Sequence, residues 1–411
     1  MKVLLLTQYF YPETGAPQNR LLGLSNKVSE SIDRFDVLTA MPNYPQRKVY
    51  DKYRWKLLHK EKMGRINIFR TFIYPSGNRG AVFRLIEYIS FAFSSLVYGL
   101  LFLPRYDIII YESPPLSIGI NAWILKIFKA NHLVANVSDL WTESLVSLGV
   151  VRNRFIIRLS HIVEMYLYSK SNLVCCQTNG IKDHINKFQK KDNLFLFRNG
   201  ADIDYIDKVL GKSVELDFRK KHKIDNNDTM ILYAGNIGYA QGIDVIIDAA
   251  RLLQNDLSKR FVIIGDGPEK DNIIKLSDQY GLANVTILDS MPREELIRMV
   301  ELSDLFIVPL RKSRLFRGAI PSKIFEALYL RIPVLLGVEG EAHDIFVKEM
   351  KAAIPFEPEN YNDLASRILE LCDNRKMQDE ISNNGYQGIC NEFNRSLILE
   401  TFMNKIGNLY D

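Results

Sequence analysis

Residues 309–334 read PLRKSRLFRGAIPSKIFEALYLRIPV. An apolar strand ends at Pro309, a Gly/Pro loop at Gly318–Ser322 follows, and a helical pattern then leads to the apolar run Ile332–Leu336. The order strand, turn, helix and strand is the unit of a parallel α/β sheet, whose ligands bind beyond the carboxyl ends of the strands. The segment therefore predicts both the fold class and the edge of the sheet at which a site would lie.

The same alternation extends along nearly the whole chain. Most apolar runs are continuously hydrophobic, as expected of parallel strands covered on both faces. Helix-like stretches such as Gln18–Ser29 and Leu116–Phe128 lie between them, and only the polar stretch at about Asp202–Asp228 interrupts the pattern. The predicted strands are Lys2–Thr7, Phe35–Ala40, Ile66–Ile73, Asp107–Tyr111, His132–Val137, Leu173–Gln177 and Leu194–Phe197 before this stretch, and Thr229–Ala234, Arg260–Ile264, Asn284–Leu288, Leu305–Pro309 and Ile332–Leu336 after it.

A chain of 411 residues with one such interruption predicts two doubly wound, Rossmann-like α/β domains. We place the first at residues 1–200 and the second at 201–390. Residues 391–411 have a helical pattern, and we expect this helix to return toward the first domain.

Composition narrows the function classes. The formal net charge of +5 is compatible with a phosphate-bearing substrate or an anionic membrane surface, and the sequence has no nucleic-acid-binding module. The four cysteines lack metal-ligand spacing and are typical of buried thiols in a reducing compartment. The N-terminal apolar run is too short for a signal peptide, so we expect a cytoplasmic protein.

Two segments of the first domain suggest contact with lipid. Ile86–Leu103 carries a single charge, Glu87, and is slightly short for a membrane-spanning helix. A spanning helix, a plain buried helix and a helix that packs on the sheet while exposing an apolar face to lipid all stay open, and the last is favoured. Arg47–Arg65 holds eight Lys or Arg against two acids, which suits anionic head groups or a lipid diphosphate, although a solvated loop would look the same. The candidate acceptor or membrane residues are Arg47, Lys48, Trp55, Phe91 and Leu101.

Glycine-containing turns follow several predicted strands. A glycine lets the backbone approach a phosphate, and a following helix supplies N–H donors, although the same turns could be purely structural. The fingerprint GxGxxG of nicotinamide and flavin enzymes is absent. The candidate donor-binding residues on these loops are Gly15 and Arg20 in the first domain, and Gly235, Asn236, Gln241, Gly265, Asp266 and Gly267 in the second.

Lys323 and Glu326 are three positions apart and can share one helix face. Lys323 would place a positive charge on a diphosphate, and Glu326 could accept both hydroxyls of a ribose. The alternative is a surface ion pair between the two. The loop before them adds Arg317, Gly318, Ala319, Ile320 and Ser322 as candidates.

Several motifs together resemble the family-4 retaining glycosyltransferases, in the branch that builds bacterial O-antigen and capsule repeat units. The motifs are SDLWTES (Ser138–Ser144), RNGAD (Arg198–Asp202), NIGYAQGID, GDGPEK and PSKIFEALYLRIPV, in the order of that family. The resemblance implies the GT-B fold, in which an acceptor-binding and a nucleotide-sugar-binding domain face each other across a cleft. It also implies a retaining, metal-independent reaction without a cofactor, and a UDP-sugar donor.

The chain departs from the family pattern at four places. Glu326 matches the second glutamate of the family's paired motif, but Gly318 occupies the position of the first. The role of that first glutamate toward the donor sugar would pass to backbone amides of Gly318–Ile320 or to Arg317. Asn236 and Gln241 stand where many members have Arg and Lys, so Lys323, Arg317 or Arg20 would meet the phosphate charge. Ser138 replaces a histidine, which leaves Asp139 as the polar catalytic candidate.

The resulting hypothesis assigns catalysis to Asp139 and Lys323. The base would lie near Asp266–Gly267 and Met291, and the sugar, of N-acetylated hexosamine type, would point toward Gly15, Asp139 and Glu143. The expected acceptor is a saccharide linked to a polyprenyl diphosphate or to another carrier, at the inner face of a membrane. A sugar-nucleotide epimerase of the same fold and an inactive membrane-associated scaffold are the alternatives.

Overall fold

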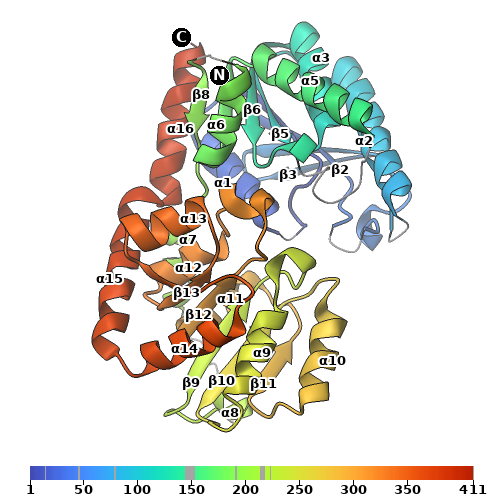
Figure 1. Ribbon diagram of the computed structural model, residues 1–411. Coiled ribbons are helices and arrows are strands. Elements are labelled where there is room, and N and C mark those ends of the chain that lie inside the picture. The colour runs from blue at the N-terminus through green and yellow to red at the C-terminus, as the bar shows by residue number, and fades with distance from the viewer. Residues whose placement is uncertain are drawn as a thin grey trace. The chain divides into compact units, whose positions relative to one another are not determined.

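The computed structural model describes residues 1–13, 15–44, 47–77, 80–143, 153–189, 192–212, 218–222 and 224–410. The chain separates into two compact units (Figure 1). The first comprises Met1–Asn199 and Leu399–Asp411, and the second comprises Gly200–Ile398. The C-terminal residues therefore group with the first unit rather than with the segment that precedes them.

The first unit is built on a sheet with the strand order β3-β4-β2-β1-β5-β6-β7-β8 in the described part of the chain. All neighbours run parallel except β3, which pairs antiparallel with β4 at the edge. The helices α2, α3 and α5 cover one large apolar cluster of this unit. Its elements are β1 (Lys2–Leu6), α1 (Ala16–Glu30), β2 (Arg34–Ala40), η1 (Asp51–Tyr53), β3 (Leu58–Met63), β4 (Ile66–Thr71), α2 (Ala81–Phe102), β5 (Tyr106–Ser113), α3 (Leu116–Lys129), β6 (Ala130–Val137), α5 (Arg154–Lys170), β7 (Leu173–Cys176), α6 (Asn179–Phe188), β8 (Leu194–Leu196) and most of α16 (Arg395–Tyr410).

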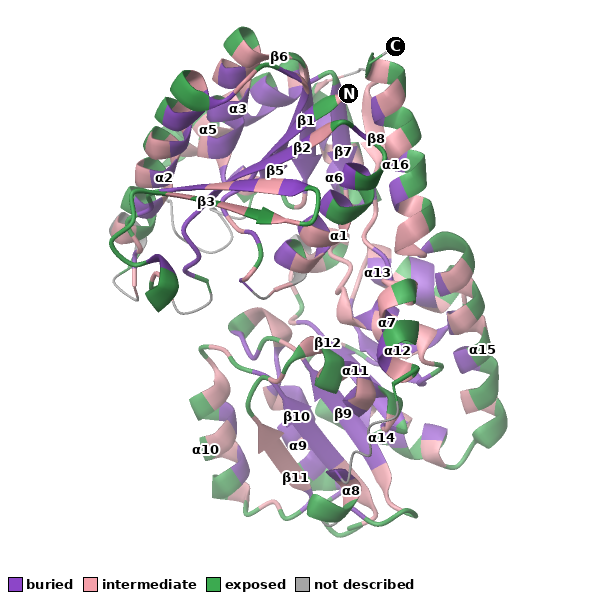
Figure 2. Ribbon diagram, turned by 180° about the vertical axis from the view of Figure 1, so that it is seen from behind, coloured by how far each residue is buried: buried purple, intermediate pink, exposed green. Residues whose placement is uncertain are grey.

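The second unit has a wholly parallel sheet of order β11-β10-β9-β12-β13-β14 among the described residues. Successive side chains of a strand point to opposite faces. Met230 and Leu232 therefore belong to one apolar cluster and Ile231 and Tyr233 to the other. The buried strands in the middle of this unit stand out in Figure 2. Helices thus cover both faces, which confirms the predicted doubly wound α/β fold.

The second unit follows this order along the chain. Its elements are α7 (Ile203–Leu210), α8 (Phe218–Lys221), β9 (Thr229–Ala234), η2 (Tyr239–Gln241), α9 (Asp244–Leu252), β10 (Lys259–Ile264), α10 (Lys270–Tyr280), β11 (Val285–Leu288), α11 (Arg293–Glu301), β12 (Leu305–Pro309), η3 (Arg314–Gly318), α12 (Lys323–Tyr329), β13 (Val334–Gly337), α13 (Glu341–His343), the π-helical turn η4 (Asp344–Glu349), β14 (Ala353–Pro355), α14 (Tyr361–Cys372) and α15 (Arg375–Glu392).

The structure corrects two expectations about segments without a clear pattern. Part of the basic segment is the edge strand β3 rather than a loop, and its alternating Lys60, Glu61 and Lys62 are the kind of charged side chains that keep a sheet edge from pairing further. The polar stretch after Asp202 contains two helices, α7 and α8, because Ile206, Val209 and Phe218 provide enough apolar surface to pack on the core of the second unit.

Candidate functional site

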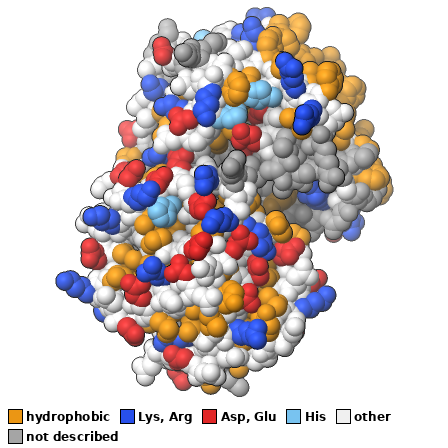
Figure 3. All heavy atoms as spheres, in the orientation of Figure 1, with side chains coloured by type: hydrophobic (Ala, Val, Ile, Leu, Met, Phe, Trp, Pro, Cys, Tyr) orange, Lys and Arg blue, Asp and Glu red, His pale blue; other side chains and the backbone are white. Residues whose placement is uncertain are grey.

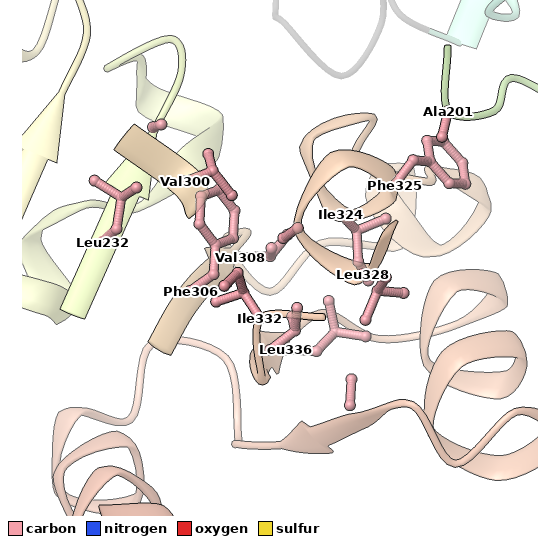
Figure 4. Close-up of a cluster of buried hydrophobic side chains, with 14 of the residues drawn as sticks. Ala201, Leu232, Val300, Phe306, Val308, Ile324, Phe325, Leu328, Ile332 and Leu336 are labelled. Carbon is pink, nitrogen blue, oxygen red and sulfur yellow. The ribbon is translucent and has the colours of Figure 1, made fainter. Parts of the chain in front are cut away.

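The short helix α12 is fixed by its apolar face. Ile324, Phe325 and Leu328 are buried among strands and helices of the second unit, and Ala201 lies beside Phe325 (Figure 4). This packing sets the rotation of the helix. Lys323 and Glu326 are the two charged residues of α12, and both occupy its first turn.

The Lys323 ammonium is enclosed without an ionic partner. The residue as a whole is partly exposed, but Nζ is buried and makes no hydrogen bond to any described residue. It lies 3.8 Å from the centroid of the Tyr233 ring, and a Cβ added to Gly235 would come within 2.8 Å of it. Burial lowers the pKa of Lys323 to about 7. An uncompensated buried cation is costly unless something anionic joins it, so this site suits an anionic ligand.

Two glycine-containing loops beside Lys323 pack directly on each other. A Cβ on Gly265 would collide with the carbonyl oxygen of Gly235, and one on Gly267, whose φ is 154°, would collide with that of Ile237. Hydrogen bonds join the loops, including Ile237 N–H to the Asp266 carbonyl at 2.8 Å. Gly265 and Gly267 are therefore required for the approach of one loop to another, whereas Gly235 leaves room for the Lys323 ammonium.

Neutral amides occupy the two loop positions at which the resembled family carries cations. Asn236 Nδ2 donates to Gln241 Oε1 at 3.3 Å, and both side chains lie on the loop after β9. Arg311 is near this loop, but its guanidinium is bound to Asp244 and Glu359, each at 2.9 Å. The positive charge that stays without a carboxylate here, among the described residues, is that of Lys323.

Glu326 is reachable and already has one ionic partner. Its side chain is 23% exposed, and Oε1 accepts hydrogen bonds from Nη2 and Nε of Arg293 at 3.0 and 3.3 Å. No hydrogen bond to Oε2 is found among the described residues. The predicted alternative, an ion pair between Lys323 and Glu326, is not what the structure contains, because the partner of Glu326 is Arg293.

The other predicted residues of the loop before α12 have mixed surroundings. Arg317 is exposed, contacts Glu339 at 3.4 Å and lines a cavity of about 470 Å³ at the ends of β13 and β14. The Ala319 N–H donates to the Phe316 carbonyl, so this amide is engaged within the loop. Ala319 and Ile320 pack partly on the core, as does Met291, while Ser322 precedes α12 without a side-chain capping bond.

In the first unit, Arg20 belongs to a closed polar network. Its guanidinium pairs with the Glu112 carboxylate and donates to Ser138 Oγ at 2.6 Å. Asn136 donates to the other Glu112 oxygen at 2.7 Å. Arg20 is therefore a buried residue that is already paired with a carboxylate, and its contact with a donor phosphate stays a prediction.

The chain is similar to known proteins in both sequence and fold. The family described as "Glycosyl transferases group 1" matches residues 214–388. The putative colanic acid biosynthesis glycosyl transferase of Escherichia coli is 25% identical over 80% of this chain and 81% of its own length. The sucrose-phosphate synthase from Thermosynechococcus elongatus superposes with a TM-score of 0.74 at 15% identity, covering 100% of this chain and 99% of the synthase. An Anabaena protein in complex with UDP and glucose has a TM-score of 0.68 at 16% identity over 99% and 100% of the two chains.

Most of the second unit thus resembles the group 1 glycosyltransferases. The predicted GT-B fold and the resemblance to the O-antigen and capsule branch are thereby confirmed. The match covers the loops after β9 and β10 and the whole of α12, which are the elements around Lys323.

The remaining candidate residues of the first unit lie after the carboxyl ends of its strands. Gly15 precedes α1, and its added Cβ would meet Gln18 and Tyr44. Asp139 is exposed just after β6 and accepts a hydrogen bond from the Leu140 N–H. Glu143 pairs with His184 at 2.9 Å. Ser144, the last residue of the SDLWTES motif, lies outside the described residues.

Sequence reasoning missed a buried carboxylate that organises the loop after β1. Glu13 accepts backbone hydrogen bonds from Asn43, Tyr44 and Phe10 at 2.7, 2.8 and 3.0 Å. It thereby joins the loop after β1 to the loop after β2. Burial raises the pKa of Glu13 to about 7, in opposition to the lowering effect of these N–H donors. Because the partners are backbone groups, no residue type in the sequence signals the contact.

The predicted lipid-contacting residues of the first unit divide into two groups. Trp55 and Leu101 are 99% and 68% exposed, Lys48 is exposed, and Arg47 is half-buried with a φ of 52°. Phe91 is fully buried, so its assignment to a lipid-facing surface is wrong. The helical period explains this, since Phe91 lies on the face of α2 that packs on the sheet.

Proposed function

We propose that this glycosyltransferase moves a sugar of N-acetylated hexosamine type from UDP to a lipid-linked saccharide in the synthesis of a bacterial surface polysaccharide, with retention at the anomeric carbon and without a metal. The observation that carries the proposal is the buried Lys323 ammonium, unpartnered among the described residues. The name of the colanic acid relative and the UDP complex of the Anabaena protein support the polysaccharide and the donor.

Lys323 has the chemistry that a leaving diphosphate needs. Negative charge develops on the diphosphate as the glycosidic bond breaks, and a preorganised cation in a buried site stabilises it. Nζ is enclosed beside Gly235, where the lack of a side chain leaves room for the ammonium. In this proposal Lys323 does the work that a metal ion does in other transferases. Asn236 and Gln241 supply neutral donors to the same group, and Asp139 is the proposed polar catalytic residue of the first unit.

The acceptor part of the proposal is supported by the outer surface of α2, α3 and α5, which are neighbours in one layer. Large hydrophobic side chains gather on this part of the first unit (Figure 3). They are Leu85, Ile86, Ile89, Phe93, Val97, Leu101 and Phe102 on α2, Ile120, Ile127 and Phe128 on α3, and Phe155, Ile156, Leu159, Ile162 and Tyr166 on α5. A patch of this extent on a soluble protein marks a membrane or protein contact.

Charge on the same helices favours an anionic bilayer. The two acids of α2, α3 and α5, Glu87 and Glu164, are buried. The charged side chains that reach the surface are basic: Arg84, Lys126, Lys129, Arg154, Arg158 and Lys170. Apolar side chains beside cations are typical of surfaces that lie in the membrane interface.

The helix α2 passes the length and composition test for a spanning helix over Phe83–Phe102. In the structure it is held to the first unit by polar contacts. Glu87 accepts hydrogen bonds from Gln8 and from the Ser76 N–H at 3.3 and 3.0 Å, and Asn121 donates to Ser95 at 3.0 Å. These contacts support a helix that packs on the sheet and exposes its other face to lipid.

The donor is tested first by a thermal-shift series with UDP, GDP and ADP and their sugar conjugates. Binding to UDP compounds alone supports the proposal, because a ligand that binds only the folded state raises its melting temperature. A labelled UDP-sugar then separates the alternatives. A transferase releases UDP only with acceptor present, an epimerase converts the donor alone, and a scaffold binds no donor.

Membrane contact is tested by flotation with vesicles of phosphatidylglycerol. We expect Phe93→Glu with Leu101→Glu to lose flotation and to keep the thermal shift with UDP. Leu257→Glu, at an exposed apolar residue of the second unit, is the matched control and should float as the wild type does. Equal flotation of all three proteins would contradict the assignment of this surface.

A further inference from the structure

The two carboxylate oxygens of Glu326 differ in their hydrogen bonds. Both hydrogen bonds from Arg293 go to Oε1, from Nη2 at 3.0 Å and Nε at 3.3 Å. Oε2 accepts no hydrogen bond from any described residue, and the side chain is 23% exposed. One oxygen is thus anchored and the other is left to accept hydrogen bonds from a ligand.

Arg293 is itself fixed from a second direction. It is the first residue of α11, and its guanidinium lies 4.5 Å from the centroid of the Tyr205 ring on α7. Its Nη1 atom is 3.5 Å from Asp202. The planar guanidinium can therefore hold its fork toward Glu326 in one orientation, which a flexible ammonium could not do.

Asp202 is held where the chain enters and leaves the second unit. Arg395 Nη1 contacts the same oxygen of Asp202 at 3.0 Å, and Arg395 Nη2 donates to the Gly200 carbonyl. Backbone hydrogen bonds pair this segment with residues 393–395, through Ala201 N–H to Phe393 and Arg395 N–H to Ala201. A chain of alternating charges thus runs from Arg395 through Asp202 and Arg293 to Glu326.

We propose that Arg293, held by Asp202, is a positioning residue that orients Glu326 so that Oε2 receives the vicinal hydroxyls of the donor's ribose. The inference rests on the proposed function and deepens it. A carboxylate accepts hydrogen bonds from both hydroxyls only if its plane is fixed, and bonds to a charged group are stronger than neutral ones. Arg293 acts only through Glu326 and does not touch the reacting atoms.

A merely structural ion pair is the competing explanation, and ribose chemistry separates the two. The test measures the dissociation constants of UDP and 2′-deoxy-UDP by calorimetry on the full chain. The wild-type protein should bind UDP about tenfold or more tightly than 2′-deoxy-UDP, as expected for a hydrogen bond to a charged group. Arg293→Met should bring this ratio close to one by weakening UDP, and Arg293→Lys should recover only part of it.

Arg298→Met is the matched control on the same helix. Arg298 donates to the carbonyls of Val209 and Lys212 and so also ties α11 to its neighbours, but it does not contact Glu326. Its variant should change both affinities alike and keep the ratio. The double variant Arg293→Met with Glu326→Gln should have the same ratio of the two dissociation constants as Glu326→Gln alone, since the two residues act as one unit.

Two results would overturn the inference, and only the second would also contradict the proposed role of Glu326. If Arg293→Met weakened UDP and 2′-deoxy-UDP equally, Arg293 would be structural and the proposed function would stand. If the wild-type protein bound UDP and 2′-deoxy-UDP equally well, the proposed role of Glu326 would be wrong as well as that of Arg293. A wild-type protein that bound no UDP at all would remove the proposed function itself.

Discussion

The two units treat a buried cation in opposite ways at the carboxyl ends of their sheets. In the first unit, Arg20 is paired with Glu112 and bonded to Ser138, and Asn136 completes the carboxylate. In the second, Lys323 is enclosed over the Tyr233 ring with no carboxylate beside it among the described residues. In the first arrangement a carboxylate of the protein balances the cation, whereas in the second a ligand has to supply the negative charge.

The difference shows how structure separates a folding contact from a binding site. Removing one partner of a buried ion pair strongly destabilises the folded protein, since the other partner is left charged and unpaired. A buried unpaired cation costs free energy in the empty protein and recovers it on binding. Sequence alone proposed Arg20 and Lys323 for the same task, because the residue type does not reveal the partner.

The largest expected effect is on stability, in the first unit. Glu112→Ala should lower the free energy of unfolding by about 3–5 kcal/mol, because it leaves the Arg20 guanidinium buried without a counter-charge. Chemical denaturation followed by circular dichroism would measure it. The double replacement Arg20→Met with Glu112→Leu should recover much of the loss. A stable Glu112→Ala protein would show that the network is not closed in solution.

The second effect falls on turnover. Lys323→Met should reduce kcat by about 10²–10³, as does removal of a group that stabilises developing charge. The same change should raise the melting temperature of the empty protein, because it removes a buried, uncompensated ammonium. Lys270→Met, at a surface pair with Asp289, is the control and should alter neither quantity much. A lower melting temperature for Lys323→Met would contradict the enclosed, unpaired state.

The smallest effect is on the pH dependence of donor binding. Burial lowers the pKa of Lys323 to about 7, and a bound diphosphate favours the protonated form. Between pH 7 and about 8.5 the affinity for a UDP-sugar should therefore fall by up to about tenfold per pH unit, with proton uptake on binding. Calorimetry in buffers of different ionisation enthalpy would detect the proton.

The stability of the empty protein should move the other way over that range. The pKa of Lys323 is lower in the folded protein than in the unfolded chain, so the unfolded chain binds more protons. The free energy of unfolding therefore rises with pH above about 7. Lys323→Met should remove both slopes. A pH-independent affinity in the wild-type protein would mean that Lys323 is already charged before the donor binds.

Much of the fold was predictable because its strands are buried on both faces. Continuous apolar runs such as Thr229–Ala234 coincide with a strand of the structure. The edge strand β3 was missed since its outward side chains carry charges rather than an apolar run. The strand β14 was also missed, because three residues are too few to establish a period.

The candidate site was predictable where one local segment carries it. Lys323 and Glu326 sit together in a helix start, and the spacing alone placed them. Arg293 was not found, because it meets Glu326 only through tertiary packing of α11 against α12. The sequence singled out Gly265 and Gly267 but not the loop carbonyls of Gly235 and Ile237 that require glycine at these positions.

The paired backbone at Ala201 and Asn394 has a consequence for how this protein can be cut and rejoined. It brings the beginning and the end of the second unit together, so that residues 200–398 form a unit whose two ends are adjacent. A fragment bounded there would have adjacent ends that a short peptide could join into a ring. Such a fragment would carry Lys323, Glu326 and Arg293 together, so the proposed nucleotide site could be moved onto another first domain as one piece.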